Sequence, residues 1–170
     1  MDKPESYVKD GSNLTEEEKE SLLLFLEKVA GPRESAQYAF NRAVATGLKH
    51  YLALVLFHNG NAHGIVSLRF HPFDRAVQVD DLRALTLRAF EKEKGHSIAA
   101  ELSLHAINAA RESGAETIGG LMTRAGTRFV ERHERSHALK ISSPESVRKE
   151  AIVAIPIESI SRKPRLPFVK

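Results

Sequence analysis

The chain has 170 residues and a mass of 18.9 kDa, the size of one domain. With 42% hydrophobic and 28% charged residues it can build a sizeable core, which excludes a disordered chain. It has no cysteine, which excludes a disulfide-stapled domain, a thiolate metal site and a cysteine nucleophile. The net charge of +3 and a pI near 9.2 are only mildly basic. With no signal peptide and no membrane span expected, we predict a cytoplasmic protein.

The first half of the chain predicts a short strand, two helices and a β-hairpin. Thr15 and Glu18 form a capping box at the start of the first helix, and Gly31-Pro32 ends it. Asn59-Gly60 is a strong signal for a hairpin turn. The expected elements are a strand over 6–9, helices over 15–31 and 34–46, strands over 51–57 and 64–70, and a third strand beginning at 76–79.

The second half predicts a clear helix from Ser97 to Ser113, where Ile98, Leu102 and Ala106 form an apolar stripe. The other expected elements are a strand over 115–123, a charged helix over 127–138, strands over 139–142 and 151–157, and an extended basic tail with prolines over 159–170. This order predicts an α/β fold with a mixed β-sheet flanked by helices.

The segment Leu82–Phe90 fits two structures. A strand places Leu85 and Leu87 on one face, whereas the intrinsic propensity of its residues favours a helix. The helical alternative gives an α+β fold with a helical hairpin over residues 81–113, and then a protein-interaction or nucleic-acid-binding module is the better interpretation. We expect the strand, because the family resemblance described below requires it.

A glycine loop opens the helix at Ser97. The sequence there is Lys92-Glu-Lys94-Gly95-His96-Ser97. Backbone N–H groups at a helix N-terminus lack partners within the helix and, together with the helix dipole, suit a pyrophosphate. Lys92 and Lys94 add positive charge.

The chain resembles the GNAT (N-acetyltransferase) superfamily in the order and spacing of its elements, over residues 6–157. Lys92-x-x-Gly95-x-Ser97 stands where the family has Arg/Gln-x-x-Gly-x-Gly/Ala, and Leu87 stands where it typically has valine. Gly114-Ala115 matches the usual end of the next helix. Thr123 stands in the place of the usual asparagine, and Phe129-Val130 in the place of Phe-Tyr. Lys92 and Ser97 depart from the loop pattern, so the acetyl-CoA loop is degenerate, and Val130 replaces the tyrosine of the later helix.

The resemblance implies a GNAT-like acyltransferase domain over residues 1–158, followed by the tail over 159–170. It implies acetyl-CoA as co-substrate and transfer of an acetyl group to an amine by direct attack. Backbone from Lys94 to Ile98, including His96, then binds the pyrophosphate, and backbone near Leu85 and Leu87 holds the pantetheine arm. The N–H of Leu87 then polarises the thioester carbonyl, and Thr123 joins the cofactor site.

The general base is expected near the diverging strands, and the sequence does not choose among Asp80, Asp81, His71 and Glu91. Val130 cannot donate a proton, so His133 is the candidate acid. The acceptor amine and the oligomeric state stay open.

Other patterns are weaker. His133-Glu134-Arg-Ser-His137 matches the His-Glu-x-x-His spacing of zinc enzymes but lies on a very polar segment, so no metal is expected. His58, His63 and His71 gather around the hairpin without a clear function. The basic tail is weak support for a nucleic-acid partner. A GNAT-like protein that does not catalyse is the alternative function.

Overall fold

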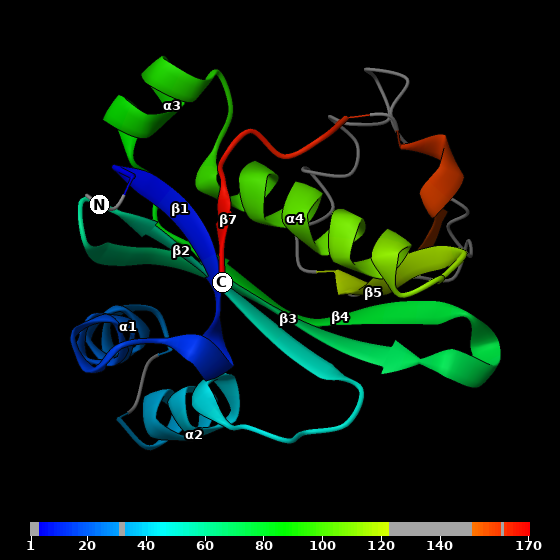
Figure 1. Cartoon of the computed structure of the whole chain (residues 1–170), viewed down its shortest axis with the longest axis horizontal. Coiled ribbons are helices and arrows are strands. Elements are labelled where there is room, and N and C mark those ends of the chain that lie inside the picture. The colour runs from blue at the N-terminus through cyan, green and yellow to red at the C-terminus, as the bar shows by residue number, and fades with distance from the viewer. Residues whose placement is uncertain (1–3, 31–32, 123–150, 161) are drawn as a thin grey trace.

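The computed structural model describes residues 4–30, 33–122, 151–160 and 162–170. Within these residues, seven strands form one mixed sheet in the order β6-β5-β4-β3-β2-β1-β7. Helices α1 and α2 cover one face of the sheet and α4 covers the other, while α3 lies beyond one end (Figure 1). The predicted α/β class with a mixed sheet flanked by helices is therefore confirmed. No helix in this part of the chain is long and apolar enough to cross a membrane.

The elements follow the chain in an order close to the predicted one. The strands are β1 (Ser6–Asp10), β2 (Tyr51–His58), β3 (Asn61–His71), β4 (Ala76–Ala84), β5 (Thr117–Met122), β6 (Ala151–Pro156) and β7 (Phe168–Val169). The helices are α1 (Glu16–Val29), α2 (Arg33–Val44), α3 (Arg88–Lys94) and α4 (Ile98–Glu112). Short 3-10 turns lie at Gly11–Asn13, Pro72–Asp74 and Ile157–Ser159.

The local signals at the start of the chain act as predicted. Thr15 caps α1, and its hydroxyl accepts a hydrogen bond from Glu18 N at 3.2 Å. The carboxylate of Glu18 is buried and accepts from Lys9 Nζ at 3.2 Å, so it ties α1 to β1. Asn59-Gly60 joins β2 to β3 as the predicted hairpin turn.

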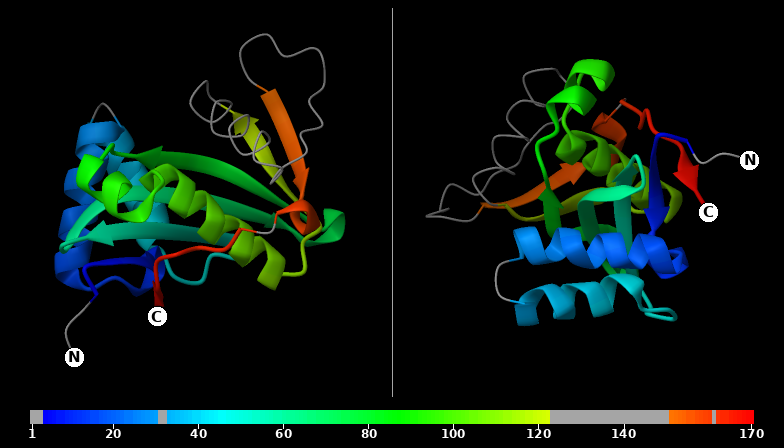
Figure 2. Two further views of the ribbon diagram at one scale, coloured as in Figure 1. Left: turned by 90° about the horizontal axis from the view of Figure 1, so that it is seen from above. Right: turned by 90° about the vertical axis from the view of Figure 1, so that its left-hand side faces the viewer.

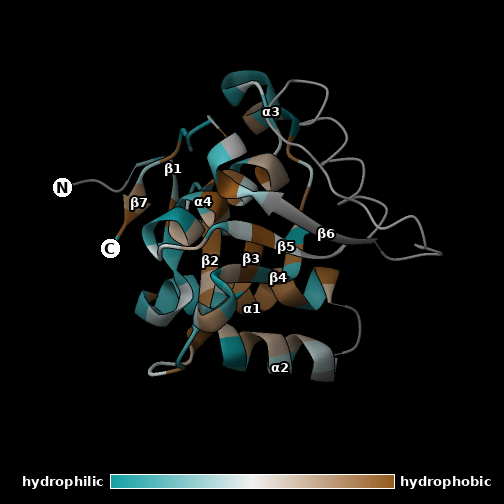
Figure 3. Ribbon diagram, turned by 90° about the vertical axis from the view of Figure 1, so that its right-hand side faces the viewer, coloured by the Kyte–Doolittle hydropathy of each residue, from teal (hydrophilic) through white to brown (hydrophobic). Residues whose placement is uncertain are grey.

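The sheet separates two apolar clusters. One packs α4 onto β2 and β3 and includes Leu56, Val66 and Leu102. The other packs α1 and α2 onto the opposite face and includes Phe25, Phe57 and Ile65. Strands β2 and β3 contribute to both clusters, because successive side chains along a strand point to opposite faces of the sheet. Colouring by hydropathy shows apolar residues on the strands between the helix layers (Figure 3).

Strands β4 and β5 run parallel but pair only briefly. Their pairing covers Ala76–Gln78 of β4 and Thr117–Gly119 of β5, after which β4 continues to Ala84 without β5. The antiparallel pair of strands β5 and β6 tilts away from the rest of the sheet, as the left view of Figure 2 shows. Among the described residues, the far half of β4 is therefore an open edge on the side of β5.

The prediction of a strand over Leu82–Phe90 is wrong beyond Ala84. The chain leaves the ladder after Leu85, is extended at Leu87 and forms α3 from Arg88. The sequence Arg-Ala-Phe-Glu-Lys-Glu-Lys consists mostly of good helix formers, and Phe90 anchors the helix with a fully buried ring. The alternative hairpin over 81–113 is wrong at its start, because β4 includes residues 81–84.

The C-terminal segment returns to the sheet. β7 pairs in parallel with β1, and Ile160 and Leu166 are buried in the same cluster as α4. The boundary predicted at residue 158 stays a prediction. The helix predicted over 127–138 and the strand over 139–142 lie outside the described residues.

Candidate functional site

The loop between α3 and α4 leaves backbone N–H groups unused at the start of a helix. Gly95 ends α3 with φ of 79°, a left-handed conformation that favours glycine. Ser97 caps α4, and its hydroxyl accepts from Ala100 N at 3.1 Å. The N–H groups of Ile98 and Ala99, in the first turn of α4, have no hydrogen-bond acceptor among the described residues. Two free donors and a helix dipole therefore meet at this loop.

The predicted lysines of this loop differ in placement. Lys92 is exposed in the last turn of α3, and Lys94 is partly buried with its ammonium 3.3 Å from Glu93. The ring of His96 bridges the loop to α4, because Nδ1 lies 3.1 Å from Lys94 O and Nε2 lies 2.5 Å from Glu101 Oε2. His96 thus shapes the loop through its own hydrogen bonds.

Glu101 is a residue that the sequence did not single out. Its carboxylate is completely buried under the loop and accepts hydrogen bonds from Arg165 N at 2.8 Å and Leu166 N at 2.6 Å. His105 Nε2 lies 3.3 Å from the same oxygen. Burial by itself would raise the pKa of Glu101, but the hydrogen bonds from His105, Leu166 N–H and His96 outweigh it and lower the pKa to about 2. A charged carboxylate therefore joins α4, the loop and the C-terminal segment.

The backbone of β4 beyond its pairing with β5 runs toward this loop. Leu85 N–H donates to His63 O at 2.9 Å, so this group is used within the sheet. Because bonded and outward-facing residues alternate in an antiparallel ladder, the N–H and C=O of Ala84 point to the side that β5 has left. The C=O of Leu87 accepts from Glu91 N at 3.0 Å, while its N–H has no partner among the described residues.

A pocket of about 530 Å³ lies on the other face of β4, under α1 and α2. The register between β3 and β4 shifts at Asp80, because Val79 pairs with Leu68 and Asp81 pairs with Ser67. Such a β-bulge places two consecutive residues against one partner, and Asp80 and Asp81 both line the pocket. Its other walls include Tyr38, Arg42, Tyr51, Ser67 and Arg83.

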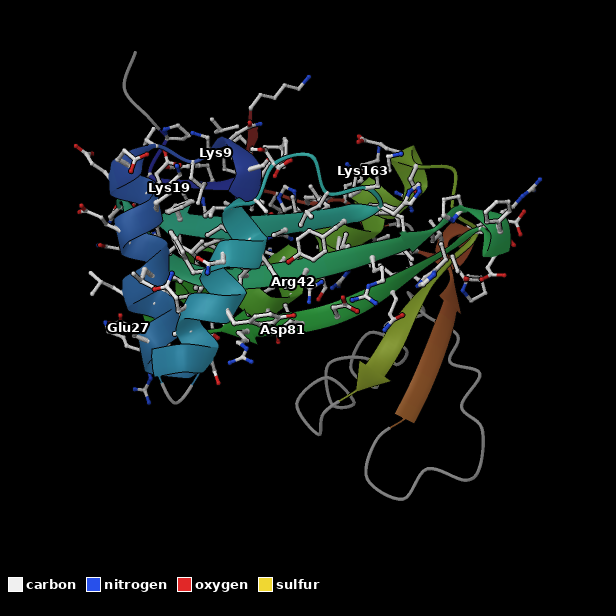
Figure 4. All side chains as sticks on the ribbon, turned by 90° about the horizontal axis from the view of Figure 1, so that it is seen from below. Lys9, Lys19, Glu27, Arg42, Asp81 and Lys163 are labelled. Atoms are coloured by element: carbon white, nitrogen blue, oxygen red, sulfur yellow. The ribbon has the colours of Figure 1, made fainter. Side chains whose placement is uncertain are left out.

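Each carboxylate in this pocket has arginine partners. Asp80 Oδ2 lies 3.0 Å from Arg69 and 3.7 Å from Arg42, whose guanidinium also lies over the Tyr51 ring. Asp81 Oδ2 accepts from Arg83 Nε at 2.8 Å. The side chain of Asp80 is 14% exposed and that of Asp81 is 34% exposed, so Asp81 is the more accessible carboxylate. Arg42 and Asp81 are labelled in Figure 4 on the α1 and α2 side of the sheet.

The hairpin histidines do not form one group. His58 Nδ1 forms a hydrogen bond with Ser6 Oγ at 2.6 Å. The rings of His58 and His63 pack edge to face, with their centroids 5.9 Å apart. Burial, followed by the nearby charges of His58 and Lys28, lowers the pKa of His63. His71 lies at the other end of β3, where Nε2 is 3.2 Å from Gln78, and is therefore far along the strand from Asp81. Among the described residues, no three or more histidine, cysteine, aspartate or glutamate side chains lie together as a group that could hold a metal ion.

The structure thus gathers the predicted residues into two places. Lys94, Gly95, His96, Ser97 and Ile98 form the loop, and Asp80 and Asp81 line the pocket on the opposite face. Glu91 lies in the first turn of α3. Thr123, His133 and the His-Glu-x-x-His pattern lie outside the described residues, so their predicted roles stay predictions.

Comparisons with known proteins give matches in structure alone. No protein-family model and no curated protein sequence matches the chain. A GNAT-family acetyltransferase from Staphylococcus aureus Mu50 superposes with a TM-score of 0.62 at 10% identity, covering 89% of this chain and 99% of that one. The ribosomal-protein-S18-alanine N-acetyltransferase from Escherichia coli gives 0.57 at 13% identity, covering 95% and 98%. The Campylobacter jejuni N-acetyltransferase PseH in complex with acetyl coenzyme A gives 0.55 at 10% identity, covering 89% and 98%.

Proposed function

We propose that this chain, which has the GNAT fold, is an acyl-CoA-dependent N-acyltransferase that transfers an acetyl group to an amine. The observation that carries the proposal is the divergence of β4 from β5 after three residue pairs. The open edge of β4 leads on one side to the loop before α4 and on the other to the pocket with Asp80 and Asp81. One strand therefore joins an anion-binding turn to a pair of carboxylates.

Acyl-CoA is supported as the co-substrate by the chemistry of the loop. The free N–H groups of Ile98 and Ala99, the dipole of α4 and the ammonium of Lys94 suit the phosphates of CoA. The space beside the α-carbon of Gly95 is empty except for the Arg165 guanidinium, so a phosphate can come close to the backbone of the loop. The similar PseH structure holds acetyl coenzyme A, which agrees with this assignment.

The backbone beyond β4 is suited to the pantetheine arm and the thioester. The N–H and C=O of Ala84 face the open side of the strand and can extend the ladder to an amide of pantetheine. The N–H of Leu87 is free to donate to the thioester carbonyl oxygen, which gains negative charge in the transition state. Leu85 acts indirectly, because its bond to His63 fixes the position of this segment.

The reaction is a direct transfer. The nitrogen lone pair of the acceptor amine attacks the thioester carbonyl carbon, the C–N bond forms, and the C–S bond breaks. The proton of the amine passes to a carboxylate, and the departing CoA thiolate takes up a proton. No covalent enzyme intermediate is required, which is consistent with a chain that has no cysteine.

Asp81 is the proposed general base. Its Oδ2 is bound by Arg83, whereas Oδ1 has no hydrogen-bond partner among the described residues. Asp80, with two arginine neighbours and less exposure, is proposed to hold Arg42 and Arg69 in place. The bulge puts both beside the pocket in which an acceptor amine would sit.

The experiment is an acetylation assay that follows release of free CoA thiol from acetyl-CoA. Amino acids, small polyamines, aminoglycosides and lysine peptides are offered as acceptors, and Asp81→Asn is run beside the wild type. The proposal expects acceptor-dependent thiol release that the variant lowers by about 10²- to 10⁴-fold. Binding of acetyl-CoA without transfer to any of these amines would favour a non-catalytic acyl-CoA-binding protein.

A further inference from the structure

The C-terminal segment crosses the loop that opens α4. In Figure 1 this segment, drawn in red, passes over the end of α4 near α3 before β7 joins β1. Its backbone is fixed on both sides of the loop. Arg165 N and Leu166 N donate to Glu101, and Pro167 O accepts from Val8 N at 3.0 Å. The position of Arg165 is therefore set by buried contacts.

The side chain of Arg165 reaches back to the loop. Its Nη1 donates a hydrogen bond to Lys94 O, at the end of α3. The same nitrogen is the heavy atom nearest to a Cβ built on Gly95, at 3.5 Å. A guanidinium has five N–H donors in one plane, and only this contact is made among the described residues. Arg165 is exposed, so its other donors face solvent beside the loop.

The C-terminal segment has no acidic side chain that would repel an anionic ligand beside Arg165. Residues 159–170 contain Arg162, Lys163, Arg165 and Lys170 and no acidic residue. The carboxylate of Glu101 below the loop is buried and already bonded to the tail amides and to His96. Free donors of Ile98 and Ala99, the N-terminus of α4 and the Arg165 guanidinium thus surround one stretch of backbone.

We infer that Arg165 binds a phosphate oxygen of the acyl-CoA pyrophosphate, so that the C-terminal segment forms a wall of the co-substrate site. This inference rests on the proposed function. An arginine suits the role because its planar donors bind phosphate oxygens in pairs. Glu101 is then a positioning residue, because it holds the backbone of Arg165 without touching the ligand.

The test compares two ligands and three variants by isothermal titration calorimetry of the full chain. Acetyl-CoA carries the phosphates, and S-acetylpantetheine carries the same thioester and arm without them. Arg165→Gln removes the charge, Arg165→Lys keeps the charge but loses the paired donors, and Arg162→Gln is a control in the same segment. Thermal melts without ligand confirm that each variant is folded.

Arg165→Gln is expected to raise the Kd of acetyl-CoA about 10- to 100-fold, the range of a lost hydrogen bond to a charged group. Its Kd for S-acetylpantetheine is expected to equal that of the wild type. Arg165→Lys is expected to lie between the two, and Arg162→Gln to match the wild type.

An equal loss for both ligands would mean that Arg165 only supports the fold of the loop, and would overturn the inference. Unchanged acetyl-CoA binding by Arg165→Gln would overturn it as well, while leaving the proposed function intact. Absence of acetyl-CoA binding by the wild type would instead overturn the proposed function.

Discussion

The Glu101 carboxylate accepts the backbone N–H of Leu166 at 2.6 Å, although 65 residues separate them in the chain. This bond joins the first turns of α4 to the C-terminal segment and lies directly under the loop at Gly95. A single buried carboxylate therefore holds the start of α4, the loop before it and the C-terminal segment together.

Replacing Glu101 with Gln should lower the stability of the chain at neutral pH by about 3 kcal/mol. The pKa of Glu101 is lowered from 4.5 to about 2, and each pKa unit corresponds to about 1.4 kcal/mol. A lowered pKa means that this stabilisation is present above pH 4.5 and is lost as the pH falls toward 2. Urea unfolding of wild type and variant between pH 7 and pH 2.5 measures it. The two curves should converge at low pH, and a constant gap would contradict the role of the charge.

Asp81→Asn should lower kcat of the acetyl transfer with little effect on the Kd of acetyl-CoA. The reason is that Asp81 lines the pocket in which we propose that the acceptor binds, on the face of β4 opposite to the loop. The matched variant Asp80→Asn, which loses contacts to Arg42 and Arg69, should reduce kcat less and thermal stability more. Steady-state kinetics measures kcat for the two variants, and thermal melts measure their stability. Equal kcat values for the two variants would contradict the assignment of Asp81 as the base.

Gly64→Ala should destabilise the chain by about 1–3 kcal/mol through overpacking. A Cβ at this position in β3 would lie 2.7 Å from Leu102 Cδ1 and 2.8 Å from Ile98 Cγ2, both in α4. The helix must shift to make room, and the loop before it shifts too. Chemical denaturation measures the loss in the free energy of unfolding. In the double variant Gly64→Ala, Leu102→Ala this loss should be smaller than the sum of the losses in the two single variants, because removing the Leu102 side chain makes room for the new Cβ. If the two losses add in full, the contact with Leu102 does not cause the destabilisation by Gly64→Ala.

Gly95→Trp should abolish stabilisation by acetyl-CoA, whereas Gly95→Ala should keep it. Both variants carry the strain of a left-handed residue, about 1–2 kcal/mol. Only Trp fills the space beside Arg165, because a Cβ alone meets nothing nearer than 3.5 Å. Thermal shifts with and without ligand distinguish the two effects. Equal ligand shifts in both variants would place the phosphates elsewhere.

Most of the fold could be predicted from local signals in the sequence. The Thr15 cap, the Asn59-Gly60 turn and the apolar stripe of Ser97–Ser113 each correspond to an observed element. The end of β4 could not be predicted, because strand and helix patterns overlap at Leu85–Phe90. The structure satisfies both, with a strand to Ala84 and a helix from Arg88.

The candidate site was only partly visible in the sequence. The loop at Gly95 could be recognised from its spacing, but the shared orientation of Asp80 and Asp81 depends on a β-bulge that has no sequence signature. The roles of Glu101 and Arg165 depend on contacts across more than 60 residues of chain. A glutamate in a helix and an arginine in a proline-containing tail are ordinary surface residues until the fold brings them together.

The most direct test of the account is a thermal melt of the wild-type chain with acetyl-CoA at about millimolar concentration, with S-acetylpantetheine and ATP as controls. A ligand at about 100 times its Kd adds about 2.7 kcal/mol, which is a rise in Tm of several degrees for a chain of this size. We expect that rise in Tm with acetyl-CoA and little or no rise with ATP. An unchanged Tm with acetyl-CoA would contradict the assignment of an acyl-CoA site to the loop at Gly95.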